Sequence, residues 1–489
     1  MRAIIVWFRQ DLRLADHGAL AAAVGTGARV VPVYVHAPEE SAPWAAGAAS
    51  RWWLHHSLAA LGRSLAEEGS QLTLRRGPSG AALAALALET GAQAIYWNRT
   101  YEPRLAARDA RVRAELTAAG LDAESFAGNV LIEPGTLLNR AGEPFRVFTP
   151  FWRAAEPRLD EIAPAAAAPA LPPLGDLAPA TQSLDSLGLL PKVRWDLGFA
   201  ARFAPGEHAA QRRLADFLDG AAESYPEGRD RPAEPGTSRL SPHLHFGELS
   251  PRQVLAAVRG SDLAPGPATR RRGLAAFLRE LGWREFAHHV LHHFPHTSEA
   301  PLDPRFARHD WRKDPAALAA WQRGATGIPL VDAGMRELWH SGWMHNRVRM
   351  VVASLLTKNL GIDWLEGARW FHDTLLDADL ASNTLGWQWT AGCGADAAPY
   401  YRIFNPVLQA ERFDPKRAYL RTWLPELRLL PDEWLHRPWL APPSVLEAAG
   451  VHLGTTYPAP IVDLRLSRER ALAAYARARS ASPAPRASG

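Results

Sequence analysis

The run Ala3-Ile4-Ile5-Val6-Trp7-Phe8 near the amino terminus predicts a buried β-strand. Its residues are all apolar, without alternation, which is typical of a central strand covered on both faces of a parallel sheet. Short apolar runs of this kind recur downstream and alternate with Ala/Leu-rich stretches of helical periodicity. We therefore expect strands at 3–8, 29–35, 71–75 and 94–97, and helices near 17–25, 48–68, 79–90 and 104–119.

The alternation of strands and helices predicts an α/β domain with a parallel sheet over residues 1–130. No GxGxxG motif follows the first strand, so the pattern does not indicate a nicotinamide cofactor. We expect residues 131–200 to form an interdomain linker, because the stretch 162–180 is rich in Ala and Pro and cannot hold a regular hydrogen-bond ladder.

Beyond residue 200 the strand pattern gives way to helical periodicity, which predicts an all-helical second domain over residues 201–478. The Ser/Ala/Pro-rich residues 479–489 are expected to be a disordered tail. Helices are expected at 207–219, 251–259, 269–293, 316–323, 331–339, 346–359 and 364–374.

The composition is typical of a folded soluble protein: the chain has 489 residues, of which 47% are hydrophobic and 22% charged. Cys393 is the one cysteine, so an intramolecular disulfide is excluded, and no Cys/His cluster indicates a metal site. The sequence has neither a signal-peptide pattern nor an apolar run long enough to span a membrane. We expect a cytoplasmic protein and, since no coiled-coil seam is present, a monomer.

The type of the charged residues says more about a binding partner than their number does. The 55 Lys+Arg residues exceed the 51 Asp+Glu residues by four, and nearly all of the cations are arginines, whose planar fork suits phosphates. A codon preference for arginine explains this equally well, so the indication of nucleic acid is weak. Codon preference explains less readily why 19 tryptophans outnumber 9 tyrosines and 16 phenylalanines.

Four clusters in the helical half mix polar and aromatic residues in a way that the core of a helical bundle usually avoids. The first joins Tyr225 and Arg229 to the segment 236–241, Gly-Thr-Ser-Arg-Leu-Ser. Small hydroxyl residues beside Gly and Arg supply donors to phosphate oxygens, although a helix cap would use the same residue types.

The second cluster consists of Glu280, Trp283 and Arg284, whose spacing places them on one helix face. An ordinary Glu–Arg helix pair would explain two of the three. The third cluster lies in the segment 342–350, where Asn346, Arg349 and Met350 combine an amide, a cation and a thioether. A buried structural ion pair with one of the acidic residues near 377–379 is the alternative here.

The fourth cluster is the segment 377–389, in which Asp377, Asp379 and Asn383 precede Trp387 and Trp389. An EF-hand loop starting at residue 377 would need Gly at its sixth position and Glu at its twelfth, and the sequence has Ser and Gln there, so calcium is disfavoured. Together the four clusters suit a large, polar, redox-active ligand better than a metal.

These residues and their order resemble the photolyase/cryptochrome family, and most of all its class I cyclobutane pyrimidine dimer photolyases. The similarity extends from residue 3 to about residue 476. It is carried by the motifs at 7–14 (Trp-Phe-Arg-Gln-Asp-Leu-Arg-Leu), 236–241, 283–286 (Trp-Arg-Glu-Phe), 342–350, 386–389 (Gly-Trp-Gln-Trp) and 402–406 (Arg-Ile-Phe-Asn-Pro).

The resemblance implies an antenna-binding α/β domain, a helical domain that binds FAD, and light-driven repair of cyclobutane pyrimidine dimers in UV-damaged DNA. In such a reaction photoexcited reduced FAD passes an electron to a flipped-out dimer, the ring opens and the electron returns. Asn383 matches the residue that faces flavin N5. The residues implied to bind FAD are Tyr225, Thr237, Ser238, Arg239, Leu240, Ser241, Phe277, Glu280, Arg284, Asn346, Arg349, Asp377, Asp379 and Asn383.

The resemblance also implies the catalytic residues Glu280, Asn346, Met350 and Asn383. Glu280 would hydrogen-bond the pyrimidine edge and stabilise developing charge, and tryptophans would wall the lesion while arginines hold phosphates. A relay of Trp387, Trp364 and Trp311 would carry electrons from the surface to the flavin. The implied lesion and DNA contacts are Arg229, Glu280, Trp283, Asn346, Arg347, Met350, Trp389 and Arg402.

The antenna chromophore, methenyltetrahydrofolate or a deazaflavin, is not fixed by the resemblance. The acidic residue that follows the Tyr-Glu step in the family's folate-binding members is missing after Tyr101-Glu102, where the chain continues Pro-Arg-Leu. The segment 50–54, Ser-Arg-Trp-Trp-Leu, looks more like plant cryptochromes and class III photolyases. A cryptochrome-type photoreceptor without repair activity is the alternative function. Repair of (6-4) photoproducts is disfavoured, because the family's paired histidines for it are absent at His345-Asn346.

Overall fold

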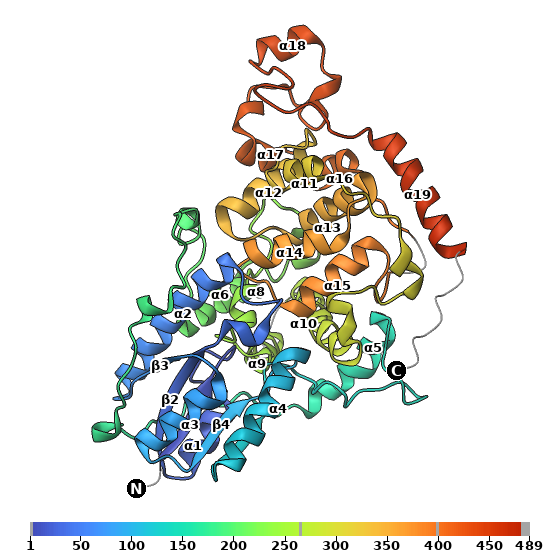
Figure 1. Ribbon diagram of the computed structural model, residues 1–489. Coiled ribbons are helices and arrows are strands. Elements are labelled where there is room, and N and C mark those ends of the chain that lie inside the picture. The colour runs from blue at the N-terminus through green and yellow to red at the C-terminus, as the bar shows by residue number, and fades with distance from the viewer. Residues whose placement is uncertain (1–2, 264–266, 398–400, 481–489) are drawn as a thin grey trace.

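The computed structural model describes residues 3–263, 267–397 and 401–480. A strand-containing domain, blue in Figure 1, lies at one end of the molecule, and the helical part of the chain covers it from one side and extends away from it. Most of the expected tail falls at 481–489, outside the described residues, while its first two residues belong to the last turn of the carboxyl-terminal helix α19 (Leu464–Ser480).

The amino-terminal domain is built on a five-stranded sheet with the order β3-β2-β1-β4-β5, in which every neighbouring pair is parallel. The expected strands are all present. A fifth strand follows the last helix of the predicted pattern. The strands of the sheet are β1 Ala3–Phe8, β2 Arg29–His36, β3 Thr73–Arg76, β4 Ala94–Asn98 and β5 Asp122–Phe126.

Helices cover both faces of this sheet, as the continuous apolar strands predict. One face packs Ile4, Val6 and Phe8 against α1 (Gly18–Gly25) and α2 (Ala48–Glu67). The other packs Ile5 and Trp7, with their neighbours, against α3 (Ser79–Thr90) and α4 (Pro103–Ala118). The first strand is thus buried at every residue, at the centre of the domain.

The edge strand β5 was not predicted, and its sequence shows why. It reads Asp-Ala-Glu-Ser-Phe and none of its residues is fully buried, so it carries neither an apolar run nor a clear alternation. Charged residues on an edge strand discourage pairing with other chains, and the same charges remove the signal by which a strand is recognised.

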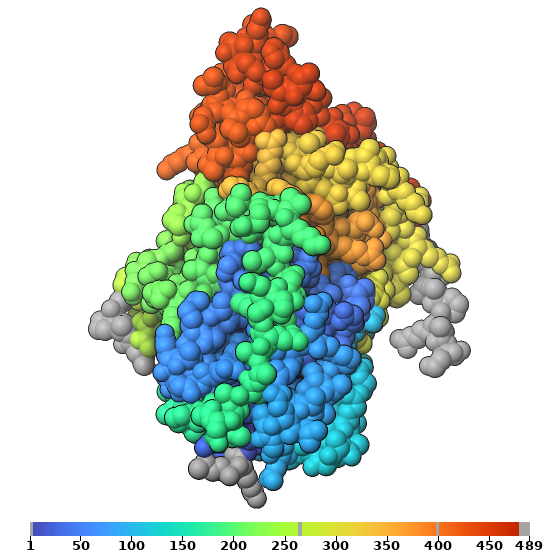
Figure 2. Space-filling model, turned by 60° about the vertical axis from the view of Figure 1, so that its left-hand side comes forward, coloured from blue at the N-terminus to red at the C-terminus, as the bar shows by residue number. Residues whose placement is uncertain are grey.

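Residues 131–200 lie against both domains instead of hanging free between them. Their helix α5 (Phe148–Ala155) places Phe148, Phe151 and Trp152 in the core of the helical part. Further along, the backbone N–H of Leu74 in β3 donates to Thr181 Oγ1 at 2.8 Å. In Figure 2 this segment, in green, crosses the surface of the blue domain. The Ala/Pro-rich stretch 162–180 lacks long helices, as expected, and is mostly exposed, with Leu171, Leu174 and Pro179 buried.

The helical part reproduces the predicted periodicity, with α6 and α14 at the expected bounds. The expected helix 346–359 is α13 followed by a π-helical segment, η8 (Leu355–Leu360). The remaining helices are α6 Glu207–Asp219, α7 Tyr225–Gly228, α8 Ser241–His245, α9 Pro251–Leu263, α10 Ala268–His293, α11 Pro315–Gln322, α12 Pro329–Ser341, α13 Asn346–Ser354, α14 Trp364–Thr374, α15 Leu380–Ala391, α16 Pro406–Phe413, α17 Ala418–Trp423 and α18 Pro443–Ala448.

Short 3₁₀ helices connect many of these elements. They are η1 Pro38–Ser41, η2 Glu156–Glu161, η3 Gly175–Leu177, η4 Leu184–Leu187, η5 Asp196–Gly198, η6 Pro295–Ser298, η7 Pro304–Arg308, η9 Pro425–Leu427 and η10 Pro438–Leu440. Within the described part of the chain, no helix combines the length and the apolar character that a membrane crossing requires.

Candidate active site

One face of the long helix α10 carries three of the predicted site residues. The carboxylate of Glu280 pairs with the guanidinium of Arg229, from the residue after α7, and both side chains are 27% exposed. Trp283, one turn further, stacks one ring face on Phe148 of α5, with ring centroids 3.8 Å apart and planes at 10°. A partly exposed acceptor and a partly exposed indole therefore share this surface.

The segment before α8 is held against α7 by two glycines. A Cβ on Gly236 would lie 2.3 Å from the carbonyl oxygen of Gly228, so this close approach of two backbones requires glycine. Beneath them, Tyr225 packs edge-on against Phe277 of α10, with ring centroids 5.5 Å apart, and both side chains are buried. The first sequence cluster is thus joined to α10.

Hydroxyl and guanidinium groups gather around the same segment. Thr237 and Ser238 line a surface hollow of about 360 Å³, together with Arg212, Arg213 and Asp216 of α6. Arg239 adopts a left-handed backbone conformation with φ of 52°, which is uncommon outside glycine, and its guanidinium lies 5.1 Å from the ring centroid of Trp343. Leu240 is buried, and Ser241 begins α8 with its side chain exposed.

The ion pair that the sequence left open for the third cluster is present. Arg349 Nη2 lies 2.8 Å from Asp377 Oδ2 and 3.1 Å from Oδ1, and its Nε donates to the carbonyl of Met344 at 2.7 Å. The Asp377 carboxylate is buried, so α13 is tied to the loop before α15 by a charge pair that solvent screens poorly.

Asp379 caps α15 by accepting the backbone N–H of Ser382 at 2.7 Å. Its other oxygen faces His288 Nε2 at 3.7 Å and His245 Nδ1 at 4.0 Å. Burial alone would raise the pKa of this carboxyl, but the two imidazoles and Arg284 outweigh it and hold the pKa well below its usual range. Asp379 therefore stays ionised.

The start of α13 carries three more of the predicted site residues. Asn346 is exposed at the first helical position, and Met350, one turn later, is half-buried. Arg347 pairs with Asp230 at 2.7 Å, beside the Arg229–Glu280 pair in sequence. His345 caps the helix through Nδ1, and burial lowers the pKa of its ring to about 3, so it acts as a neutral acceptor.

The helix α15 holds the last predicted residues. The side-chain amide of Asn383 donates to the carbonyl of Ala368 in α14 at 3.0 Å, which fixes the orientation of the amide. The guanidinium of Arg402, an exposed residue, lies 5.0 Å from the ring centroid of Trp389, whose ring also stacks on Phe404. The guanidinium of Arg402 and the indole of Trp389 thus lie beside each other at the protein surface.

Comparison with known proteins shows the family to which the chain belongs. The model "FAD binding domain of DNA photolyase" matches residues 277–477, and "DNA photolyase" matches residues 4–172. The chain is 48% identical over 480 residues to the deoxyribodipyrimidine photo-lyase of Agrobacterium fabrum, with 97% of each chain covered. The chain belongs to the photolyase/cryptochrome family.

Two further relatives show the range of that family. Cryptochrome-1 of Arabidopsis thaliana is 40% identical over 474 residues, which cover 95% of this chain and 69% of the cryptochrome. The crystal structure of a bacterial class III photolyase from Agrobacterium tumefaciens matches with a TM-score of 0.94 and 48% identity over 98% of each chain.

These comparisons confirm the predicted family, the α/β and all-helical fold, the FAD-binding domain and the assignment to the photo-lyase class of enzymes. DNA repair of the photolyase type follows at the same level. The finer likeness to class I stays a prediction, and so do the roles of the individual residues.

The donor set of this photolyase-family chain fits FAD. Hydroxyls and guanidiniums around the hollow at Thr237 and Ser238 suit a diphosphate, because both types of group donate to phosphate oxygens. The Arg349–Asp377 pair and the oriented Asn383 amide supply a cation, an anion and a fixed dipole for a polar heterocycle. Tyr225 and Phe277 add an apolar wall.

The three tryptophans predicted to form the relay differ in burial. Trp387 and Trp364 are buried, and Trp311 is half-buried. Among the described residues, the rings in contact with Trp387 are those of Phe371 and Trp321, at centroid distances of 5.0 and 6.1 Å. Gly367 leaves room for the indole, since a Cβ there would lie 2.1 Å from it.

Sequence reasoning missed Glu285, although it is part of the motif at 283–286. Its carboxylate accepts the backbone N–H groups of Leu131 and Ile132 at 2.8 and 3.1 Å and faces Arg284 at 3.3 Å. An acidic residue in an apolar stretch of helix is the signal that could have identified it, because such a group is buried only with partners.

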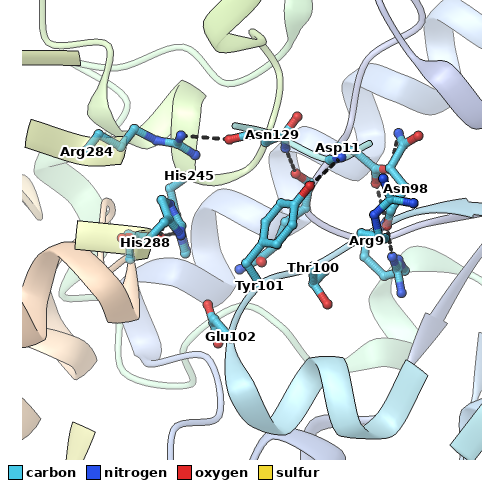
Figure 3. A pocket seen from close by; sticks show the side chains of 14 residues that line it. Arg9, Asp11, Asn98, Thr100, Tyr101, Glu102, Asn129, His245, Arg284 and His288 are labelled. Carbon is cyan, nitrogen blue, oxygen red and sulfur yellow. Dashed lines mark hydrogen bonds and ion pairs between the residues drawn. The ribbon is translucent and has the colours of Figure 1, made fainter. Parts of the chain in front are cut away.

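A second feature that the sequence did not predict is a small polar cavity of about 40 Å³ between the two domains (Figure 3). Arg284, His245, His288 and Asp379 line it from the helical side, while the ends of β1 and β4 line it from the other. Arg284 is directed across this boundary and donates to the carbonyl of Asn129 at 2.7 Å. Two predicted flavin-pocket residues thus also face the domain interface.

Proposed function

We propose that the protein repairs cyclobutane pyrimidine dimers in DNA by light-driven electron transfer from reduced FAD to a dimer turned out of the duplex. The observation that carries the proposal is the partly exposed Glu280 carboxylate on the same face of α10 as the partly exposed ring of Trp283. A pyrimidine dimer has apolar faces and polar edges, so an indole wall beside an acceptor matches its chemistry.

FAD, when bound in its reduced form, supplies the photoexcited electron that opens the cyclobutane ring and takes it back. Thr237, Ser238, Arg239 and Ser241 hold the diphosphate side of the cofactor, with Leu240 and the Tyr225–Phe277 pair packing against its apolar parts. Arg284, Arg349, Asp377, Asp379 and Asn383 orient the ring system. The buried charge pair fixes the positions of these groups before light arrives, so no reorganisation is needed during the reaction.

The arginines around the opening bind the DNA backbone. Arg229, Arg347 and Arg402 are all partly or fully exposed, and each can exchange its present contact for a phosphate oxygen. A dimer within the duplex must leave the base stack to reach the site. This unstacking costs roughly a few kcal/mol, and the cost is lowest for a damaged, poorly stacked base. Asn346, Met350 and Trp389 then line the lesion with Glu280 and Trp283.

Glu280 orients the dimer by accepting a hydrogen bond from an N–H group at the pyrimidine edge. Before DNA binds, the ion pair with Arg229 holds the carboxylate in place. The Asn383 amide, already bonded to Ala368, cannot act as an acid, which suits a working state with a fully reduced, anionic flavin.

Trp387, Trp364 and Trp311 form the path by which electrons from the surface reduce an oxidised flavin. Indoles oxidise readily, and several short transfers are faster than one long one. We expect Trp387→Phe to abolish blue-light reduction of the oxidised flavin while repair by chemically reduced protein persists. Trp434→Phe, another partly buried indole against the same core, is the control. Reduction of Trp387→Phe at the wild-type rate would refute the relay.

An antenna pigment, methenyltetrahydrofolate or a deazaflavin, stays part of the proposal. A cavity of about 130 Å³ between the domains, lined by Tyr34, Trp44, Phe246 and His372 among others, offers aromatic walls to a planar ring. Extraction of pigments from the purified protein and mass spectrometry identify it, and Trp44→Ala should release it if it binds in this cavity.

The proposed activity is tested by illuminating the fully reduced protein with an oligonucleotide that carries one cyclobutane thymine dimer, and separating intact from damaged strand by chromatography. We expect restored thymines under blue light, none in the dark, and no repair of a (6-4) photoproduct. Reduced protein that restores no thymine would favour the cryptochrome-type photoreceptor, to which 40% identity with a plant cryptochrome lends support.

A further inference from the structure

The polar cavity between the domains contains titratable groups that the proposed repair reaction does not use. From the α/β side it is lined by residues at the ends of β1 and β4, including Glu102, and from the helical side by His245 of α8, His288 of α10 and Asp379 at the start of α15. Figure 3 shows Glu102 and the two imidazoles around the same space.

Several nitrogens at this cavity have no hydrogen-bond partner among the described residues. They are His245 Nδ1 and both ring nitrogens of His288, and the side chains are only 8% and 9% exposed. Asp379 Oδ2, at 3.7 and 4.0 Å, is too far for a hydrogen bond with either ring. Buried polar atoms are rarely left unsatisfied, and a polar cavity of about 40 Å³ has room for ordered water to pair with them.

Glu102 brings an exchangeable proton to that water. Burial and the negative charge of Asp379 raise the pKa of its carboxyl to about 7, against a hydrogen bond from Gln10 and the charge of Arg108. Burial lowers the pKa of both His245 and His288 to about 4, so the imidazoles are neutral and can accept a proton. Glu102 and Asp379, two of the three carboxyl groups that line this cavity, therefore differ in protonation near neutral pH, as acid and base partners do.

The cavity shares residues with the flavin pocket. Arg284 and Asp379 line it, and both are among the groups that we propose to orient the ring system. Reduction of FAD to its anionic reduced form consumes two electrons and one proton. The electrons come from an external thiol through the tryptophans, but Asn383 has no acidic proton to give. The chain must obtain this proton elsewhere.

We propose that the cavity is the proton-supply site of the cofactor pocket, with Glu102 as the proton donor. The O–H bond of the Glu102 carboxyl breaks, its proton passes through cavity water to the His288–Asp379 side and on to the cofactor, and Glu102 is left as a carboxylate that solvent reprotonates. This inference rests on the proposed function, because it requires a flavin that is reduced in place.

The charged and titratable groups that face Glu102 come from every element packed around it. Asp379 opposes its ionisation, while the arginines favour it, and the neutral imidazoles add little charge of their own. No three His, Cys, Asp or Glu side chains in the described ranges are arranged to hold a metal ion. The charged and titratable groups that line the two cavities beside Glu102 are Arg9, Asp11, Tyr34, His36, Arg99, Tyr101, Arg108, His245, Arg284, His288, His372 and Asp379.

The first test reads the proton itself, without activity. In protein labelled with ¹³C at the Glu carboxyls and kept in the dark, infrared spectroscopy should show a protonated-carboxyl band that titrates near pH 7. The band should be absent from Glu102→Gln. In Glu102→Asp a protonated-carboxyl band should be present at a shifted frequency, because the aspartate carboxyl carries no ¹³C label. Glu133→Gln is the matched control, because Glu133 is paired with Arg99 and Tyr101 just outside the cavity. A titrating band that survives in Glu102→Gln overturns the assignment.

The second test follows proton uptake during illumination with a pH-indicator dye. Glu102→Gln should slow uptake on the order of tenfold or more, whereas Glu102→Asp and Glu133→Gln should not. In the wild type the rate should fall as the pH rises through about 7. Uptake at the wild-type rate in Glu102→Gln overturns the proton-donor role while leaving the proposed function intact. Failure of the wild-type flavin to be reduced by light, with a Glu102 band present, contradicts the relay instead.

Discussion

Two glutamates on α10, five positions apart, show how the same residue type serves different ends. Glu285 is 2% exposed and accepts two backbone N–H groups besides facing Arg284. Glu280 is 27% exposed, and Arg229 is its one partner among the described side chains. The first carboxylate is fully committed to the fold, and the second has lone pairs to spare for a ligand.

The comparison teaches that burial and partner number separate a structural carboxylate from a binding one, even where the local sequence is similar. Both residues lie beside an arginine on the same helix, so charge pattern alone does not distinguish them. What differs is the neighbouring part of the chain: residues 131 and 132 cover Glu285, while the Glu280 side chain is partly exposed. The two sites should therefore fail in different ways when mutated.

The largest effect is expected for Glu285→Ala, which leaves two buried N–H groups and the Arg284 guanidinium unpaired. The free energy of unfolding should fall by about 3 kcal/mol or more, measured by guanidinium denaturation. Glu285→Gln keeps one acceptor and should lose less. A loss below about 1 kcal/mol in the alanine variant would mean that the carboxylate contributes little net stability, and the comparison would break.

Glu280→Gln should do the reverse. Removing a charged hydrogen-bond acceptor costs about 1.5–3 kcal/mol of lesion binding and orientation, so repair at limiting protein concentration should slow by roughly 10- to 100-fold. Unfolding free energy should change by less than about 1 kcal/mol, because the ion pair is partly exposed. The control is Glu227→Gln, which alters an exposed pair with Arg272. Normal repair with lost stability would reverse the assignment of the two glutamates.

The same contrast applies to two tryptophans of α15, two positions apart. Trp387 is buried at 2% exposure, while Trp389 is half-buried beside Arg402. Trp389→Ala should weaken binding of dimer-containing DNA by about 1–2 kcal/mol, the range for stacking of one base, and leave flavin photoreduction unchanged. Fluorescence titration measures the affinity. Unchanged affinity for the lesion would remove Trp389 from the site.

The smallest effect concerns pH and Glu102. Its folded-state pKa of about 7 lies above the ordinary value, so its contribution to stability is present below about pH 4.5 and is lost as the pH rises to about 7. Glu102→Gln has no charge to bury. Its melting temperature should therefore exceed that of the wild type by about 2 °C at pH 8 and match it more closely at pH 5. The same offset at both pH values would contradict the raised pKa.

The fold was predictable where buried residues form a clear apolar pattern in the sequence. β1 is apolar throughout, β2 is apolar except at its two ends, and α6 and α14 have one apolar face, so their bounds were close to those observed. The edge strand β5 and helix α5 escaped prediction. β5 has charged residues, and the short α5 lies in a Pro-containing segment whose aromatics pack only against distant helices.

The site was predictable in part. Arg349 and Asp377 were expected near each other, and the structure joins them at 2.8 Å, because both belong to motifs that the sequence displays. Glu285 and the cavity at Glu102 depend on contacts with residues more than a hundred positions away along the chain. Local sequence periodicity does not reflect such contacts, so they can be identified only from the three-dimensional arrangement of the two domains.

The most direct test of the account is a single flash of blue light given to the fully reduced protein in complex with a dimer-containing oligothymidylate. We predict that absorbance in the thymine band recovers while the flavin spectrum returns to that of the reduced form, since the electron that opens the ring comes back. A flash that leaves the flavin oxidised and the thymine absorbance unchanged would contradict electron transfer to a dimer held in this site.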